Sequence, residues 1–262
     1  MPTPKLGKYL GRRKDHPDHR DRILPTPYVI IGVPLPSSAN VFAGLSLPVY
    51  DQENLGSCTA NCWVLVRRFL AQKFYTRSQP DQDLSRLWLY FRERKLPWNN
   101  DVSQDSGAEM RDGCNVLAHF GVPPERDDPY DVTKFADSTV NDSTQSDTDA
   151  VRYEIQGYHR ILDLPGLKNV LAHGYAVAMG FTVYASFENI GPDGIMPIPE
   201  PGDDALGGHA VCIYGYDDSR QQLLIRNSWG SAWGMSGDFW MPYEFATQQL
   251  AQGDIDLWLA HL

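Results

Sequence analysis

One cysteine in this chain occupies a position where physical chemistry favours a nucleophile. Cys58 follows Gly56-Ser57 and begins an apolar run that continues to Leu70. We predict that this run is a buried central helix with Cys58 at its N-terminus. Unpaired backbone N–H groups and the positive end of the helix dipole favour a thiolate at that position. Gln52, six residues upstream, has a side-chain amide that can turn back to donate a hydrogen bond beside the sulfur.

A histidine and an asparagine near the C-terminus complete the candidate site. Residues 209–216 and 222–227 have the pattern of two strands on either side of a turn centred on Asp218. A regular hairpin of this kind makes His209 and Asn227 direct cross-strand neighbours, with side chains about 5 Å apart on one face. An imidazole within reach of the cysteine holds it as a thiolate, and the carboxamide of Asn227 orients that imidazole without adding a charge.

Each of these residues also has an ordinary structural explanation. An isolated cysteine is more often a buried packing residue, and an isolated histidine is more often a hydrogen-bonded core residue. The combination of Cys58 with His209 and Asn227 favours catalysis. The other cysteines, Cys62, Cys114 and Cys212, are expected to be buried free thiols. A zinc site is not favoured, because the chain has no C-x-x-C pair.

Four further segments show a regular apolar period. Residues 81–95, 110–120 and 164–173 have helical spacing, and residues 175–184 form an apolar run typical of a buried strand. By contrast, residues 127–149 are rich in Asp, Ser and Thr, a composition that buries little surface. We expect this last stretch to be solvated and to mark a boundary between two lobes.

The motifs around the candidate residues resemble those of papain-like cysteine peptidases. The similarity includes Gln52, the Gly-Ser-Cys stretch 56–58, the Gly-Gly-His-Ala-Val stretch 207–211 and the Asn-Ser-Trp-Gly stretch 227–230, in the family's chain order. It extends from about residue 50 to the C-terminus. The DQ-x-x-LGSCTAN form, together with the DHPDHRD stretch near the N-terminus, is similar to a compact bacterial subgroup. Leu55 occupies a position where many relatives have a disulfide cysteine, so the resemblance does not extend to the family's bridges.

The resemblance implies an α+β, two-lobed papain-like fold. A mainly helical lobe, residues 49–150, would carry the nucleophile helix. A mainly β lobe, residues 151–262, would carry the histidine and the asparagine on an antiparallel, barrel-like sheet. Residues 1–48 would then be an N-terminal extension with a regulatory or pro-segment role.

The activity implied by the resemblance is that of a cysteine peptidase working through a thioester acyl-enzyme. Cys58 would be the nucleophile, His209 the base and then the acid, and Asn227 the orienting group. The amide of Gln52 and the backbone N–H of Cys58 would stabilise the oxyanion. Trp229 would shield the histidine–asparagine hydrogen bond from water. No metal or organic cofactor is expected. Two alternatives remain: a deamidase or transglutaminase acting on Gln side chains, and a catalytically inactive binding module.

The resemblance also indicates which residues bind substrate. Gly107 and Ala108 fall where a strand of small residues pairs with the substrate backbone. Met179, Gly180 and Ala210 are expected to line the pocket for the second residue before the scissile bond. Lining of this kind would suit an apolar side chain.

Composition limits the partners. Hydrophobic residues make up 42% of the chain, as in globular proteins, and the formal net charge of −10 argues against nucleic acid as a main partner. No apolar run reaches the roughly 18 residues of a membrane-spanning helix. The N-terminus lacks the apolar region of a secretory signal, so we expect a cytoplasmic protein or one exported by a signal-independent route. The expected partner is a peptide or protein substrate, and the expected state is a monomer.

The charge is unevenly distributed along the chain. Residues 1–22 contain seven Lys or Arg and three Asp, a net charge of +4, which leaves −14 for the remainder. A basic arm can lie on an acidic body, and the apolar stretch 28–33 is typical of a strand or an extended docking segment. We therefore predict that residues 1–45 form a built-in regulator over or beside the cleft. The alternatives are a permanent strand on the second lobe and a solvated tail.

Overall fold

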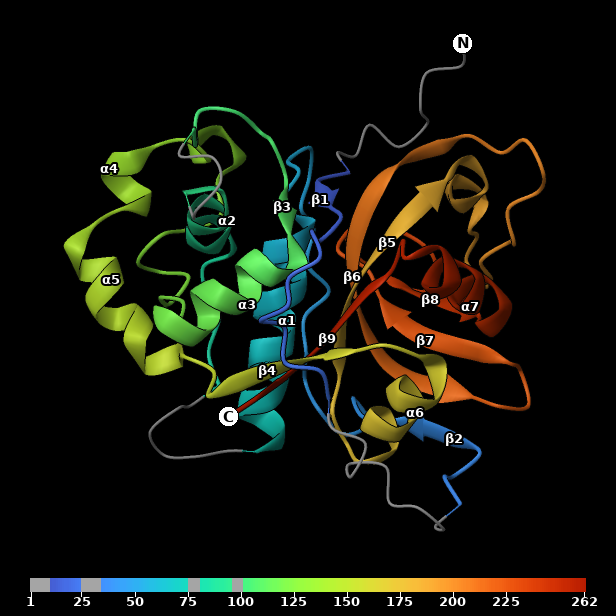
Figure 1. Ribbon diagram of the computed structural model, residues 1–262. Helices are drawn as coiled ribbons and strands as arrows, with labels where there is room; N and C mark the ends of the chain where they lie inside the picture. The colour runs from blue at the N-terminus through green and yellow to red at the C-terminus, as the bar shows by residue number, and fades with distance from the viewer. Residues whose placement is uncertain (1–9, 25–33, 75–80, 96–100) are drawn as a thin grey trace.

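The computed structural model describes residues 10–24, 34–74, 81–95 and 101–262. These residues form a helical lobe and a β lobe on either side of helix α1 (Cys58–Lys73) (Figure 1). The predicted α+β, two-lobed fold is confirmed. Within the described ranges, no helix has both the length and the apolar character needed to cross a membrane.

Helix α1 is central because it is apolar on nearly every face. Trp63, Val64 and Phe69 point in different directions around its axis, and all three are fully buried. The helix begins at Cys58, as predicted, after the turn that Gly56-Ser57 forms. Burial on all sides fixes the position of this N-terminus within the molecule.

The helical lobe packs two further helices against α1. They are α2 (Arg86–Lys95) and α3 (Met110–His119), so the predicted helix at 81–95 begins five residues later than expected. The acid-rich stretch is more ordered than its composition suggested. It contains the 3₁₀ turn η2 (Val132–Lys134) and the helices α4 (Ser138–Asn141) and α5 (Thr144–Ala150), and the 3₁₀ turn η3 (Val151–Tyr153) follows it. Asp137 and Ser143 cap the two helices through their side-chain oxygens, which explains how so polar a segment forms helical turns.

The β lobe contains a seven-stranded antiparallel sheet. Its strand order is β4-β9-β5-β6-β7-β8, and β2 pairs with β6 outside this path. The strands are β2 (Ser38–Asn40), β4 (Gly157–Ile161), β5 (Val177–Tyr184), β6 (Ala205–Asp217), β7 (Gln222–Arg226), β8 (Asp238–Pro242) and β9 (Asp256–His261). Helices α6 (Leu164–Ala172) and α7 (Tyr243–Gln252) and the 3₁₀ turn η4 (Ala185–Asn189) accompany it. Among the described residues the edge strands β4 and β8 do not pair with each other, so the antiparallel, barrel-like sheet is not closed.

The sheet separates two hydrophobic cores. Strand alternation places Ala178 of β5 and Trp258 of β9 in the core around α1. Their neighbours Met179 and Leu257 face the second core, within the β lobe. The face toward α1 is therefore the one that can contribute to the candidate site.

The hairpin of β6 and β7 differs in register from the prediction. Tyr216 pairs with Leu223, and Cys212 pairs with Arg226 after a bulge between Ile213 and Gly215. His209 and Asn227 are therefore not direct cross-strand partners. At the end of the ladder, the observed pairing differs from the predicted pairing by an even number of residues. The side chains of His209 and Asn227 therefore still lie on the same face of the sheet, diagonally across from each other.

The N-terminal residues cross between the lobes (Figure 1). Strand β1 (Arg12–Arg13) pairs in parallel with β3 (Ala108–Glu109) of the helical lobe. Ile23 forms a parallel bridge to Arg160 of the β lobe. The apolar stretch 28–33, predicted to be a strand or docking segment, lies outside the described residues.

Candidate active site

Cys58 lies at the first position of α1 and is completely buried. Burial raises the pKa of its thiol to about 11, although backbone hydrogen bonds from Gly11 and Ala210 act in the opposite direction. The thiol is therefore neutral at physiological pH in this state. Ala210 directly follows His209, so the histidine strand passes beside the sulfur.

His209 is held by the predicted partner. Its Nε2 lies 2.7 Å from Oδ1 of Asn227, and that oxygen also accepts the backbone N–H of Ser228 at 2.7 Å. Because an amide oxygen only accepts, Nε2 carries the proton and Nδ1 is left with a lone pair. This Nδ1 is buried and has no hydrogen-bond partner among the residues described. Burial lowers the pKa of His209 to about 4, although the hydrogen bond that it donates to Asn227 acts in the opposite direction, so the imidazole is neutral.

Trp229 covers this pair. Its ring centroid is 4.7 Å from that of His209, with an interplanar angle of 31°. Phe187 meets the Trp229 ring edge-on at 5.5 Å, and Trp233 does so at 5.2 Å. The Trp229 ring therefore lies against the His209 ring, beside the hydrogen bond to Asn227.

Gln52 connects the nucleophile loop to the asparagine loop. Its Nε2 donates to the carbonyl of Leu55 at 2.9 Å, and its Oε1 accepts the hydroxyl of Ser228 at 2.8 Å. Its backbone N–H also donates to the Ser228 carbonyl at 2.9 Å. These bonds fix a buried amide between the elements that carry Cys58 and Asn227. Ser228 is a positioning residue that the sequence reasoning did not single out.

The chain's own N-terminal segment lies across this site. The N–H of Ala108 donates to the carbonyl of Gly11 at 2.9 Å. The approach is so close that a Cβ added at Gly11 would lie 1.8 Å from the carbonyl oxygen of Gly56. A Cβ at Gly107, which has a φ of +67°, would lie 1.8 Å from the Gly11 oxygen. Glycine is required on both sides of this contact, and the contact covers Cys58.

The structure brings most of the predicted substrate-binding residues together. Gly107 and Ala108 pair with the N-terminal segment, and Ala210 lies beside Cys58. Gly180 is the cross-strand neighbour of Ala210. The exception is Met179, whose side chain packs in the β-lobe core and does not join the others.

Two charged residues near this site were also missed. Asp256 lies beside Gly180 on β9, and Arg12 of the N-terminal segment forms an ion pair with it. A signal was present, because Asp256 directly precedes the apolar run 257–260 at the start of its strand. No comparable signal marks Arg12, which is one of seven basic residues in an unpatterned stretch.

The other cysteines are structural in this state. All four cysteines are free and buried, and Cys62 directs its sulfur at the Val211 carbonyl at 3.1 Å. Within the described part of the chain, no three His, Cys, Asp or Glu side chains form a group able to hold a metal ion.

Comparison with known proteins places this site in a family. The model of the papain family of cysteine proteases matches residues 44–252, which is most of the chain. The chain belongs to the papain family of cysteine proteases. It is therefore a cysteine-type peptidase, and a deamidase or transglutaminase is not favoured.

Relatives extend the similarity to papain-family proteins from different sources. The chain is 31% identical to the uncharacterized peptidase C1-like protein L477 of Acanthamoeba polyphaga mimivirus, over 99% of this chain and 88% of that protein. Among solved structures, xylellain, a cysteine protease from Xylella fastidiosa, is 33% identical with a TM-score of 0.81, covering 100% of this chain and 98% of xylellain. The resemblance to a bacterial papain-like subgroup is thereby confirmed.

A more distant structure supports the fold alone. Procathepsin B S9 of Trypanosoma congolense has a TM-score of 0.73 at 15% identity, covering 98% of this chain and 88% of that one. The papain-family arrangement of two lobes is thus retained where little of the sequence is shared.

Proposed function

We propose that this papain-family peptidase uses Cys58 as its nucleophile and His209 as its base. The observation that carries the assignment is the orientation of the imidazole. Asn227 occupies Nε2, which leaves the buried Nδ1 without a partner. The backbone of the next residue along the strand, Ala210, lies close enough to Cys58 to lower the pKa of its thiol. A histidine on the strand that passes beside the thiol, with an unpaired basic nitrogen, can supply the base that thiolate formation requires.

In the proposed reaction, Nδ1 of His209 accepts the Cys58 proton and the thiolate attacks the peptide carbonyl carbon. The oxyanion accepts hydrogen bonds from the Cys58 backbone N–H and the Gln52 amide. His209 then donates its proton to the leaving amine, and a thioester forms. Water attacks the thioester, gives its proton to His209 and releases the acid, after which His209 returns the proton to Cys58. Asn227 keeps the ring oriented throughout.

We also propose that the described state is a latent one. The Gly11 carbonyl takes the Ala108 N–H that a substrate backbone would need, and Gly11 covers the sulfur. Both members of the catalytic pair are neutral under this cover. Departure of residues 10–13 would open the cleft and hydrate Cys58 and His209. This supports a regulatory role for the N-terminal extension.

Replacement of two cysteines on one helix tests the catalytic assignment. Cys58→Ala should abolish hydrolysis of a fluorogenic peptide library, because it removes the nucleophile. Cys62→Ala is the matched control: Cys62 is also a buried free thiol on α1, one turn further along, and it should keep most of the activity. Undiminished hydrolysis by purified Cys58→Ala protein would overturn the proposal.

A further inference from the structure

A second thiol lies one helical turn beyond the proposed nucleophile. Cys62 follows Cys58 by four residues on α1, and both side chains are buried and free. Residues four apart in a helix lie on the same face, with Cβ atoms about 5–6 Å apart. Side chains in a helix also lean toward its N-terminus, so Cys62 leans toward the turn that carries Cys58. The proposed mechanism gives this second thiol no task.

Both sulfurs face the same strand. Helix α1 packs against β6 (Figure 1), and Sγ of Cys62 lies 3.1 Å from the carbonyl oxygen of Val211 on that strand. The backbone of Ala210, the preceding residue, lies close enough to Cys58 to lower the pKa of its thiol. Burial raises the pKa of Cys62 well above its usual value, and the nearby thiols of Cys212 and Cys58 raise it further. Cys58 and Cys62 are therefore neighbours in space as well as on the helix.

The positions of the two residues on α1 are compatible with a disulfide. Helix geometry places Cα atoms four residues apart at about 6.2 Å, inside the range that disulfides span, which ends at about 6.8 Å. The Cβ atoms must approach each other by about 1–2 Å. Cys58 is the first residue of α1, so its N–H makes no bond within the helix, and the preceding Ser57 makes no side-chain cap bond. A shift of Cys58 therefore disturbs at most the one helical hydrogen bond that its carbonyl accepts.

Oxidation of this pair would begin at Cys58. Departure of the Gly11 cover would expose its sulfur, and a thiolate is the form of cysteine that peroxides oxidise. Cys62 and Cys212 lie in the core around α1 and stay there when the cover leaves. Cys212 is the competing partner for Cys62, but a bond between those two would leave the nucleophile free.

We propose that Cys62 is the resolving thiol of a reversible oxidation switch, which stores Cys58 as a Cys58–Cys62 disulfide when the open enzyme meets a peroxide. The inference rests on the proposed function, because it requires Cys58 to be the reactive thiol of the cleft. The competing account is that Cys62 only packs in the core as a small apolar residue.

The proposed switch has two steps. The Cys58 thiolate attacks one oxygen of the peroxide, the O–O bond breaks, and the leaving hydroxide takes the proton that His209 holds and becomes water. The sulfur of Cys62 then attacks the sulfenic sulfur of Cys58, the S–S bond forms, the S–O bond breaks, and the Cys62 proton leaves with the hydroxide as a second water. Each sulfur loses one electron and the peroxide gains two.

The presence of Cys62 decides whether the oxidation can be reversed. A sulfenic acid that no thiol captures is oxidised further to a sulfinic acid, which ordinary thiol reductants do not restore. A disulfide blocks hydrolysis equally well, but a dithiol returns both cysteines to the free form.

Mass spectrometry of the full-length protein tests the proposal. Hydrogen peroxide is added until no free Cys58 thiol remains, the other thiols are blocked with iodoacetamide, and the protein is digested with trypsin. Residues 23–67 form one tryptic peptide that contains both cysteines, since no Lys or Arg lies between Arg22 and Arg67. We expect this peptide to be lighter by two hydrogens and to carry no blocking group. Dithiothreitol added before the blocking step should return both thiols, and peptide hydrolysis should recover with them.

Two variants separate a resolving thiol from a packing residue. Cys62→Ala should lose the disulfide and accumulate sulfinic acid on Cys58, two added oxygens that dithiothreitol does not remove, so hydrolysis should stay lost. Cys212→Ala is the matched control, because Cys212 is also a buried free thiol close to Cys62, and it should form the disulfide and recover as wild type does.

The wild-type result alone can overturn the inference, so it holds even if Cys62→Ala does not fold. Sulfinic acid on Cys58 beside a free Cys62, a Cys62–Cys212 disulfide, or a Cys58 thiol that peroxide does not consume would each contradict the switch. These masses do not depend on turnover, so the switch can fail while Cys58-dependent hydrolysis stands. Failure of the proposed function would show differently, as undiminished hydrolysis by protein in which Cys58 is fully disulfide-bonded.

Discussion

At the scale of single residues, the main feature is that the proposed catalytic pair, Cys58 and His209, is neutral. Burial moves the pKa of Cys58 up to about 11 and that of His209 down to about 4, so neither side chain carries charge near neutral pH. The sequence indicated a thiolate, from the position of the cysteine at a helix N-terminus. That argument did not include the cover formed by Gly11, which removes the water that a thiolate needs. A distant segment thus decides the ionisation of a residue whose local sequence favours the opposite.

The ionisation of Cys58 can be measured directly. The difference in ultraviolet thiolate absorbance between wild type and Cys58→Ala reports this one sulfur. A raised pKa means that the thiolate is absent at low pH and forms only as pH rises, so the full-length protein should show no step below pH of about 9. A step at or below neutral pH would mean that a thiolate–imidazolium pair already exists in the resting protein.

At the scale of elements, α1 could be predicted and the β6–β7 register could not. The helix followed from a local pattern, because apolar residues on every face require burial. The hairpin register depends on the bulge between Ile213 and Gly215, and a Cβ at Gly215 would lie 2.5 Å from the carbonyl oxygen of Ala39 on β2. The bulge accompanies close packing of a strand from the N-terminal extension, a contact that no local pattern contains. His209 and Asn227 keep a common face because the displacement at the end of the ladder is even.

The pairing of strand β1 with strand β3 can also be tested at the scale of elements. Gly11→Ala should prevent it, because the new Cβ would meet the Gly56 carbonyl at 1.8 Å and backbone surrounds it. Hydrolysis of a small peptide should rise, because the cleft is uncovered without any change to the body of the enzyme. Gly191→Ala is the control, since its Cβ would make only an ordinary contact at 3.6 Å with Asp193. Loss of activity together with melting temperature would instead identify β1 as a structural strand.

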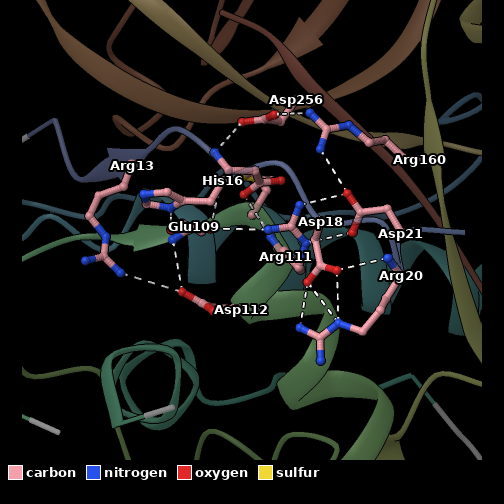
Figure 2. Close-up of polar contacts among 12 residues, drawn as sticks. Arg13, His16, Asp18, Arg20, Asp21, Glu109, Arg111, Asp112, Arg160 and Asp256 are labelled. Atoms are coloured by element: carbon pink, nitrogen blue, oxygen red, sulfur yellow. Dashed lines mark hydrogen bonds and ion pairs between the residues drawn. The ribbon is translucent and has the colours of Figure 1, made fainter. Parts of the chain in front are cut away.

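At the scale of the whole molecule, charge places the N-terminal segment on the body. Arg12 pairs with Asp256, and Lys14 pairs with Asp254 at 3.0 Å, as expected for a basic arm on an acidic body. An acidic residue of the segment also pairs with basic residues of the body, since Asp21 binds Arg111 of the helical lobe and Arg160 of the β lobe (Figure 2). The segment therefore ties the two lobes together.

Net charge predicted that the arm lies on the body but not where it lies. The path across the cleft depends on glycine contacts and on the vacant position at Gly180, which appear only when the two lobes are assembled. The family motifs, by contrast, can be recognised in the sequence without the assembled fold. They are short and local, so Gln52, Cys58, His209 and Asn227 could be selected from the sequence before any fold was known.

The central claim is that Cys58 is the nucleophile of a peptidase whose cleft is covered by its own N-terminal segment. Labelling with a thiol-directed epoxide, located by mass spectrometry and followed alongside peptide hydrolysis, tests it most directly. The full chain and a chain lacking residues 1–22 are compared at equal concentration. We expect the label on Cys58 alone, loss of activity in proportion to labelling, and faster labelling and hydrolysis after the deletion. Activity that survives complete labelling of Cys58, or rates that do not rise after the deletion, would contradict the account.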